Sequence, residues 1–162
     1  MFWLFGMILP LSILGCSHDE PRILATLNHS ASLVGTLPAN PLQWKVISSM
    51  IDPADSTMST LYGNDIVVGY VRTHSQHDYP AGSQLSLVTW TQQEDPRWFG
   101  AKIPEAVKSV EFVIVGSAQD GRPSYFYVKY EGSPLRKSVD RKSATPNERA
   151  AYLLSQRAAV MP

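Results

Sequence analysis

The sequence contains a single cysteine among its 162 residues, Cys16. One thiol excludes an intramolecular disulfide, and it excludes a C-x-x-C-H motif, which attaches haem through two thiols. Excess charge is lacking as well, because 14 basic residues balance 14 acidic residues and give a formal net charge of +0. Since no basic stripe is present either, the sequence predicts no nucleic-acid partner.

No lysine or arginine occurs before Arg22, so the N-terminal apolar region contains neither. The apolar run from Phe2 is shorter than the ~20 residues of a membrane span, and it ends at Cys16. The preceding Ile-Leu-Gly completes a stretch that resembles a bacterial lipobox, in which the cysteine is lipidated. We therefore expect a lipoprotein signal peptide over residues 1–15, although signal peptides usually begin with a basic residue. A short apolar tail with a buried cysteine is the open alternative.

Lipidation at Cys16 implies a bacterial cell envelope, because acyl chains hold a protein to a membrane. Ser17 follows, and in Gram-negative lipoproteins a residue other than aspartate at this position usually permits transfer to the outer membrane. The expected location is therefore the outer membrane, with the protein lipid-anchored and facing the periplasm. Residues 16–40 show no sustained hydrophobic period and are expected to form a tether.

One domain is expected over residues 41–162, with short strands because twelve prolines and ten glycines indicate many turns. Strands are predicted over residues 83–91, 109–115 and 124–130. Asp120-Gly121 is a typical hairpin turn between the last two strands. Residues 92–104 between the first two are expected to be a loop.

The clearest helix signal begins at Thr145, where a threonine cap, a proline and Glu148 have the spacing of a capping box. It predicts a helix over residues 146–159. Residues 66–73 stay open, because Asn64 is a suitable helix cap but the β-branched residues that follow favour a strand.

These pieces predict an α+β fold in which an antiparallel β-sheet packs against a few helices. Eight residues are expected in its core: Trp44, Ile66, Val88, Trp90, Val110, Phe112, Val128 and Leu153.

The order of three segments resembles the cytochrome P-460 family. These segments are Gly63-Asn64-Asp65-Ile66, then Pro80-Ala81-Gly82, and then a strand that ends at Trp90 and is followed by another from Ser109. The resemblance covers roughly residues 41–130. It implies an antiparallel sheet with packed helices, usually in a homodimer, and haem-bearing members attach c-type haem near the C-terminus through C-x-x-C-H.

The residues that perform this haem chemistry are missing here. No cysteine follows Cys16, no histidine follows His77, and Leu87 stands where family members often have lysine. The resemblance thus supports the fold and argues against the family's enzymatic activity. We expect no covalent haem and no catalytic residue, while noncovalent haem stays open.

Two loops contain candidate binding residues. His74, His77 and Asp78 are ligand-type side chains, but structural zinc needs four ligands, so the preferred interpretation is a solvated loop without metal. Arg97, Trp98 and Phe99 are suited to stacking a flat ligand or docking a protein. The alternative is that the two aromatic residues cover the open face of the sheet.

Glu111 interrupts an apolar strand, and it either contacts a ligand or faces solvent. Two functions follow as hypotheses. The first is a non-catalytic envelope lipoprotein that binds a small ligand or a protein between the 74–80 loop and the Arg97–Lys102 loop. The second is a noncovalent haem-binding or residual redox protein, and a structural protein acting through dimerisation is a third option.

Overall fold

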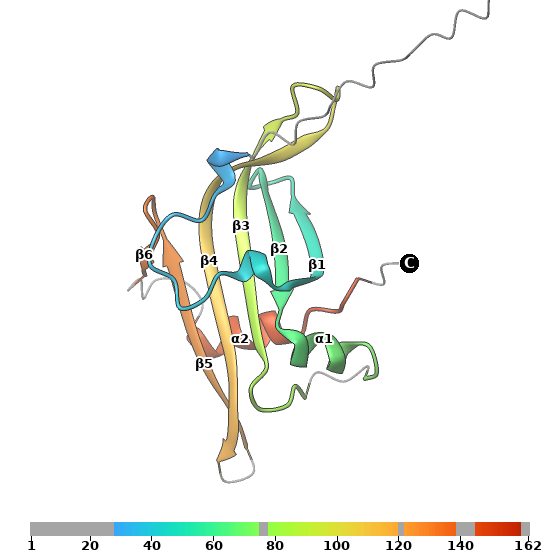
Figure 1. Cartoon of the computed structure of the whole chain (residues 1–162), viewed down its shortest axis with the longest axis vertical. Helices are drawn as coiled ribbons and strands as arrows, with labels where there is room; N and C mark the ends of the chain where they lie inside the picture. The colour runs from blue at the N-terminus through green and yellow to red at the C-terminus, as the bar shows by residue number, and fades with distance from the viewer. Residues whose placement is uncertain (1–27, 75–77, 120–121, 139–144, 160–162) are drawn as a thin grey trace, which may run out of the picture.

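Six antiparallel strands form one sheet in the order in which they follow along the chain, β1-β2-β3-β4-β5-β6 (Figure 1). This computed structural model describes residues 28–74, 78–119, 122–138 and 145–159. The strands are β1 (Lys45–Asp52), β2 (Thr57–Gly63), β3 (Gln84–Glu94), β4 (Lys102–Gln119), β5 (Arg122–Glu131) and β6 (Arg136–Lys137). The expected antiparallel sheet is confirmed, and it dominates the α+β fold.

In the described ranges, four short helical segments accompany the sheet. They are the 3-10 helices η1 (His29–Ala31) and η2 (Pro41–Gln43) and the α-helices α1 (Asp65–Val71) and α2 (Pro146–Leu154). Within the part of the chain described, no helix combines the length and the apolar character that crossing a membrane requires.

The two α-helices cover one face of the sheet. Successive side chains of a strand point to opposite faces, and on this face Leu85 of β3 and Val113 of β4 are fully buried. They pack in one cluster with Val67 of α1 and Leu153 of α2. Helix α2 crosses behind the strands in Figure 1.

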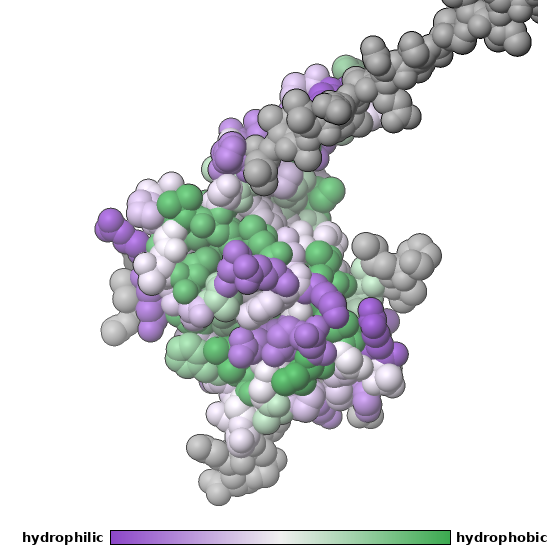
Figure 2. All heavy atoms as spheres, in the orientation of Figure 1, coloured by the Kyte–Doolittle hydropathy of each residue, from purple (hydrophilic) through white to green (hydrophobic). Residues whose placement is uncertain are grey.

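The N-terminal segment covers the opposite face, in front of the strands in Figure 1. Here Val88 and Phe112 form a second cluster, against which Leu37 and Trp44 pack. Figure 2 shows this face, with apolar residues along its upper left and polar residues across its centre. The sheet is therefore buried on both faces, each by a different part of the chain.

Residues 28–40 belong to the domain and are not a tether. The indole Nε1 of Trp90 donates a hydrogen bond to the Ala31 carbonyl at 2.9 Å, and the Leu135 amide donates to the Val34 carbonyl at 2.7 Å. A Cβ on Gly35 would lie 2.5 Å from the Leu135 carbonyl, so the two backbones touch. The tether prediction for residues 16–40 is thus wrong for 28–40. Its remainder, Cys16 and the expected signal peptide lie outside the described residues.

Residues 65–71 form helix α1, which decides between the two predictions for residues 66–73. Asn64 caps it: the side-chain Oδ1 accepts from the Val67 amide at 3.2 Å. The same oxygen accepts from the Gln84 amide at 3.3 Å, and Nδ2 donates to the Gly82 carbonyl at 2.9 Å. Asn64 therefore ties the start of α1 to the start of β3.

The core prediction is confirmed for six residues and wrong for one. Trp90, Val88, Val110, Phe112, Val128 and Leu153 are buried, and Trp44 is half-buried. Ile66 is 45 % exposed, because the helix turns it outward while Val67 and Val68 point to the sheet.

Two element boundaries also differ from the predictions. The loop expected over residues 92–104 is confirmed only for residues 95–101, since β3 continues to Glu94 and β4 already begins at Lys102. Helix α2 ends at Leu154 and not at Ala159. The following residues run back toward β1, where the Ala159 amide donates to the Ile47 carbonyl at 2.8 Å.

Replacing Asn64 by alanine should lower the free energy of unfolding by about 2 kcal/mol, because the helix cap and the hydrogen bonds to Gly82 and Gln84 are lost together. Urea denaturation measures this change. Asn147→Ala is the matched control, since Asn147 is exposed on α2 and should change stability by less than about 0.5 kcal/mol. Equal losses in the two variants would contradict the role of Asn64.

Candidate functional site

Strands β3 and β4 continue past the rest of the sheet as a two-stranded arm. Pairing of β3 with β2 ends at Thr91, and pairing of β4 with β5 begins only at Ser109. Beyond these limits Gln93 and Glu94 pair with Ile103 and Lys102 alone. Figure 1 shows the arm projecting at the top of the molecule.

The turn at the end of the arm, residues 95–101, is held by its own hydrogen bonds and is called the tip below. The Asp95 Oδ1 accepts from the Arg97 amide at 2.8 Å. The Ala101 amide donates to the Trp98 carbonyl at 3.0 Å, and Gly100 between them has a φ of +77°, which suits the third position of a type II turn. Phe99 therefore sits at the apex of a defined turn.

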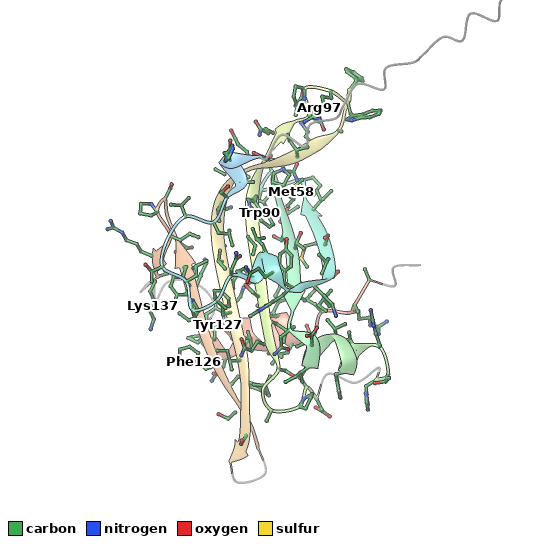
Figure 3. All side chains as sticks on the ribbon, viewed as in Figure 1. Met58, Trp90, Arg97, Phe126, Tyr127 and Lys137 are labelled. Atoms are coloured by element: carbon green, nitrogen blue, oxygen red, sulfur yellow. The ribbon has the colours of Figure 1, made fainter. Side chains whose placement is uncertain are left out.

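The aromatic side chains of the tip point into solvent. Trp98 is 70 % exposed and Phe99 110 %, so the interpretation that they cover the sheet is wrong. Arg97 is exposed beside them (Figure 3). At the base of the tip, Lys102 Nζ lies 2.9 Å from Glu94 Oε1.

Glu111 has a different environment from either one expected. Its side chain is only 3 % exposed, so the solvent-facing interpretation is wrong. Oε2 and Oε1 accept from Nε and Nη2 of Arg149 at 2.7 and 2.8 Å, and Tyr127 Oη donates to Oε2 at 2.6 Å. The carboxylate is fully engaged, and it holds α2 against the sheet without facing an open site.

This buried cluster changes the acid–base behaviour of its members. The hydrogen bond to Glu111 raises the pKa of Arg149. Burial, and then the bond to Glu111, raise the pKa of Tyr127. The guanidinium of Arg149 also lies 4.6 Å from the centre of the Tyr152 ring. At neutral pH Arg149 is therefore positively charged and the Tyr127 phenol is neutral.

The His74 imidazole is engaged locally. Its ring stacks on Tyr70 with centroids 4.3 Å apart, and Nδ1 lies 2.7 Å from Thr73 Oγ1. Asp78 is exposed, while His77 lies outside the described residues. No group of three ligand-type side chains able to hold a metal ion occurs in the described segments.

The two loops expected to frame one site lie at opposite ends of β3. The described part of the first loop, residue 74 and residues 78–80, precedes the start of the strand, and the tip follows its end, so these residues form no common site (Figure 1). Sequence reasoning missed Tyr127 and Arg149 as partners of Glu111. The signal was Glu111 itself, because a charge in an otherwise apolar strand needs a partner when it is buried.

The family model of cytochrome P-460 matches residues 38–148, from the N-terminal segment on the sheet to the first turn of α2. The chain belongs to the cytochrome P-460 family. The resemblance expected from the Gly63-Asn64-Asp65 segment and its neighbours is therefore confirmed. No curated protein matches the chain.

The residues of this cytochrome P-460 domain do not fit a haem attached through thioethers. The matched residues 38–148 contain no cysteine, and the one thiol of the 162 residues is Cys16. The only described histidine in the matched range is His74, whose Nδ1 already contacts Thr73. No reaction step through haem follows from this donor set.

Replacing Arg149 by methionine should lower the free energy of unfolding by about 3 kcal/mol, because Glu111 is left buried without its charged partner. The double change Glu111→Met/Arg149→Met should recover most of this loss. Urea denaturation of the three proteins gives the comparison.

Lys45→Met is the control for this series. Lys45 Nζ pairs with Asp65 at 3.0 Å on the surface, with side chains 63 % and 88 % exposed. Loss of such a pair costs less than about 1 kcal/mol. A loss in Arg149→Met no larger than in Lys45→Met would show that the buried pair does not stabilise α2.

The Tyr127 phenol predicts a stability change at high pH. Its folded pKa is raised above 10.0, so the folded protein keeps a proton that the unfolded chain loses above about pH 10. The stability advantage of the wild type over Tyr127→Phe should be constant from neutral pH to about 10 and shrink above it. Denaturation at a series of pH values tests this, and a difference that does not vary with pH would contradict it.

Proposed function

We propose that the protein is a cell-envelope lipoprotein whose cytochrome P-460 domain has no covalent haem and acts by binding instead of catalysis. One observation carries this proposal. The only thiol of the chain, Cys16, stands outside the family domain of residues 38–148 and ends an apolar run. Thioether attachment of haem needs two thiols in the domain, which contains none. Lipidation needs one cysteine at the end of an apolar run, which is the position of Cys16.

A lipid at Cys16 places the domain at a bacterial membrane. Two or more acyl chains give stable attachment, whereas a single chain gives only reversible binding. We propose the periplasmic side of the outer membrane, because Ser17 follows the cysteine. A homodimer of the family type remains a prediction.

The tip is the proposed contact surface. Small ligands bind in concave sites that enclose most of their surface, but Trp98 and Phe99 stand on a projecting turn and are exposed. The Glu111 carboxylate is closed off by Arg149 and Tyr127. These features favour a partner with an extended surface over a small molecule.

One denaturing gel tests both parts of the proposal on the full chain, expressed in bacteria together with cytochrome c maturation proteins and labelled palmitate. The wild type should take up palmitate and show no haem by peroxidase staining. Cys16→Ser should lose the palmitate label.

A c-type cytochrome expressed in the same cells is the positive control for haem staining. A haem-positive band of this protein, or equal palmitate labelling of both variants, would overturn the proposal. The absorbance spectrum after addition of free haem distinguishes the alternative function from the proposed one, because a Soret band would support noncovalent haem binding.

A further inference from the structure

We infer that the tip is a second membrane contact, which rests in the surface of the bilayer next to the lipid anchor. The inference rests on the proposed anchor at Cys16 and names the partner of the contact surface. Three observations carry it: the exposure of the tip, the position at which the N-terminal segment meets the arm, and the small size of the tip.

The composition of the tip suits the boundary between water and lipid. Trp98 and Phe99 find no cover within the described residues, being 70 % and 110 % exposed. Transfer of large aromatic side chains out of water is favourable, and tryptophan is enriched at membrane interfaces. Because the turn is held by hydrogen bonds of Asp95 and Trp98, the rings are presented without a further ordering of the backbone.

The charges around the rings allow this placement. Arg97 is exposed and has no ion pair among the residues of known placement. A long arginine side chain keeps its charge at the headgroup level while its stem lies along apolar surface. The two acidic residues that precede Arg97 most closely in the sequence are engaged, since Glu94 pairs with Lys102 and Asp95 accepts from a backbone amide.

The N-terminal segment enters the domain on the arm. Asn28, the first described residue, donates from Nδ2 to the Pro104 carbonyl at 2.5 Å, and Pro104 lies opposite Gln92 in the arm. The twelve residue steps from Cys16 to Asn28 span at most about 40 Å. A lipid at Cys16 is therefore joined to the domain at the end of the molecule from which the tip projects (Figure 1).

The size of the tip argues for lipid over protein. A stable protein complex buries about 20–30 residues on each side, but only the five residues 96–100 form the continuous exposed turn. A bilayer has no such minimum contact, because each aromatic side chain inserts independently. A few inserted residues are enough when a lipid anchor keeps the protein at the surface.

Quenching by brominated lipids tests the inference on the full chain, reconstituted in vesicles of phosphatidylethanolamine and phosphatidylglycerol. Bromine on the acyl chains quenches tryptophan that enters the bilayer. The signal of Trp98 is the difference between the wild type and Trp98→Phe, in which all other tryptophans are shared. We expect this difference to lose most of its intensity in brominated vesicles.

The control adds a tryptophan at another exposed aromatic position, Phe126→Trp in the Trp98→Phe protein. Phe126 is 56 % exposed on β5, away from the tip (Figure 3). Its added emission should be the same in brominated and ordinary vesicles. Both exchanges replace one exposed aromatic residue by another, so the fold should be retained, and equal thermal midpoints confirm this.

The possible outcomes distinguish failure of the membrane contact at the tip from failure of the lipid anchor at Cys16. Palmitate labelling without quenching of Trp98 overturns the membrane contact and leaves the anchor in place. Quenching of Trp98 without palmitate labelling supports the contact and overturns the anchor. A tip that is unquenched and cross-links to an envelope protein would overturn the inference in favour of a protein partner.

Discussion

The pairing of β3 with β4 is the interaction on which the other features depend. It runs from Gln84 opposite Ile114 to Glu94 opposite Lys102, longer than the pairing of β2 with β3. Its central part is covered by helices on one face and by residues 28–44 on the other. Its outer part has no further strand of the described residues beside it and forms the arm. One strand pair thus supplies both the core and the projecting surface.

The Glu111 cluster shows how the sheet stabilises helix α2, which would not be stable in isolation. Helix α2 has nine residues, too few for a stable isolated helix in water. Leu153 gives it apolar contact, and the two hydrogen bonds from Arg149 to Glu111 fix its position along β4. A buried ion pair is weak evidence for stability because desolvation opposes it. The Arg149–Glu111 pair therefore serves to fix the position of α2 along β4 as well as to stabilise the fold.

Local signals predicted the parts of the fold that depend on local chemistry. The capping box at Thr145 is present, with Glu148 bonded back to the Thr145 amide at 2.8 Å, and strands β4 and β5 flank the predicted turn. The arm was missed because Gln92, Gln93 and Glu94 are polar on both sides of the strand. Such a strand has no alternation to detect, since neither face is buried.

Long-range contacts account for the other errors. Residues 28–40 contain no periodic pattern, yet the Trp90 indole and the Leu135 amide fix them to the sheet. A sequence pattern of one segment cannot include a partner about 60 or 100 residues away along the chain. The role of Glu111 was missed for the same reason, because Arg149 lies 38 residues further on. In the candidate site, the sequence indicated Arg97, Trp98 and Phe99 as binding residues but left open whether the two aromatic rings are exposed or cover the sheet.

The fold and the family's haem chemistry depend on different residues. Asn64 joins α1 to β3, and Arg149 joins α2 to β4, through hydrogen bonds within the chain itself. These joints use no thiol and no histidine, so the contacts that hold the two α-helices to the sheet do not include the side chains on which thioether attachment of haem depends. Trp98 and Phe99 lie at the surface of the tip, where exposure of their rings to water is unfavourable and no contact with the rest of the described chain offsets it. In the inferred membrane contact these rings would leave water, and this is the physical argument for placing the tip against lipid.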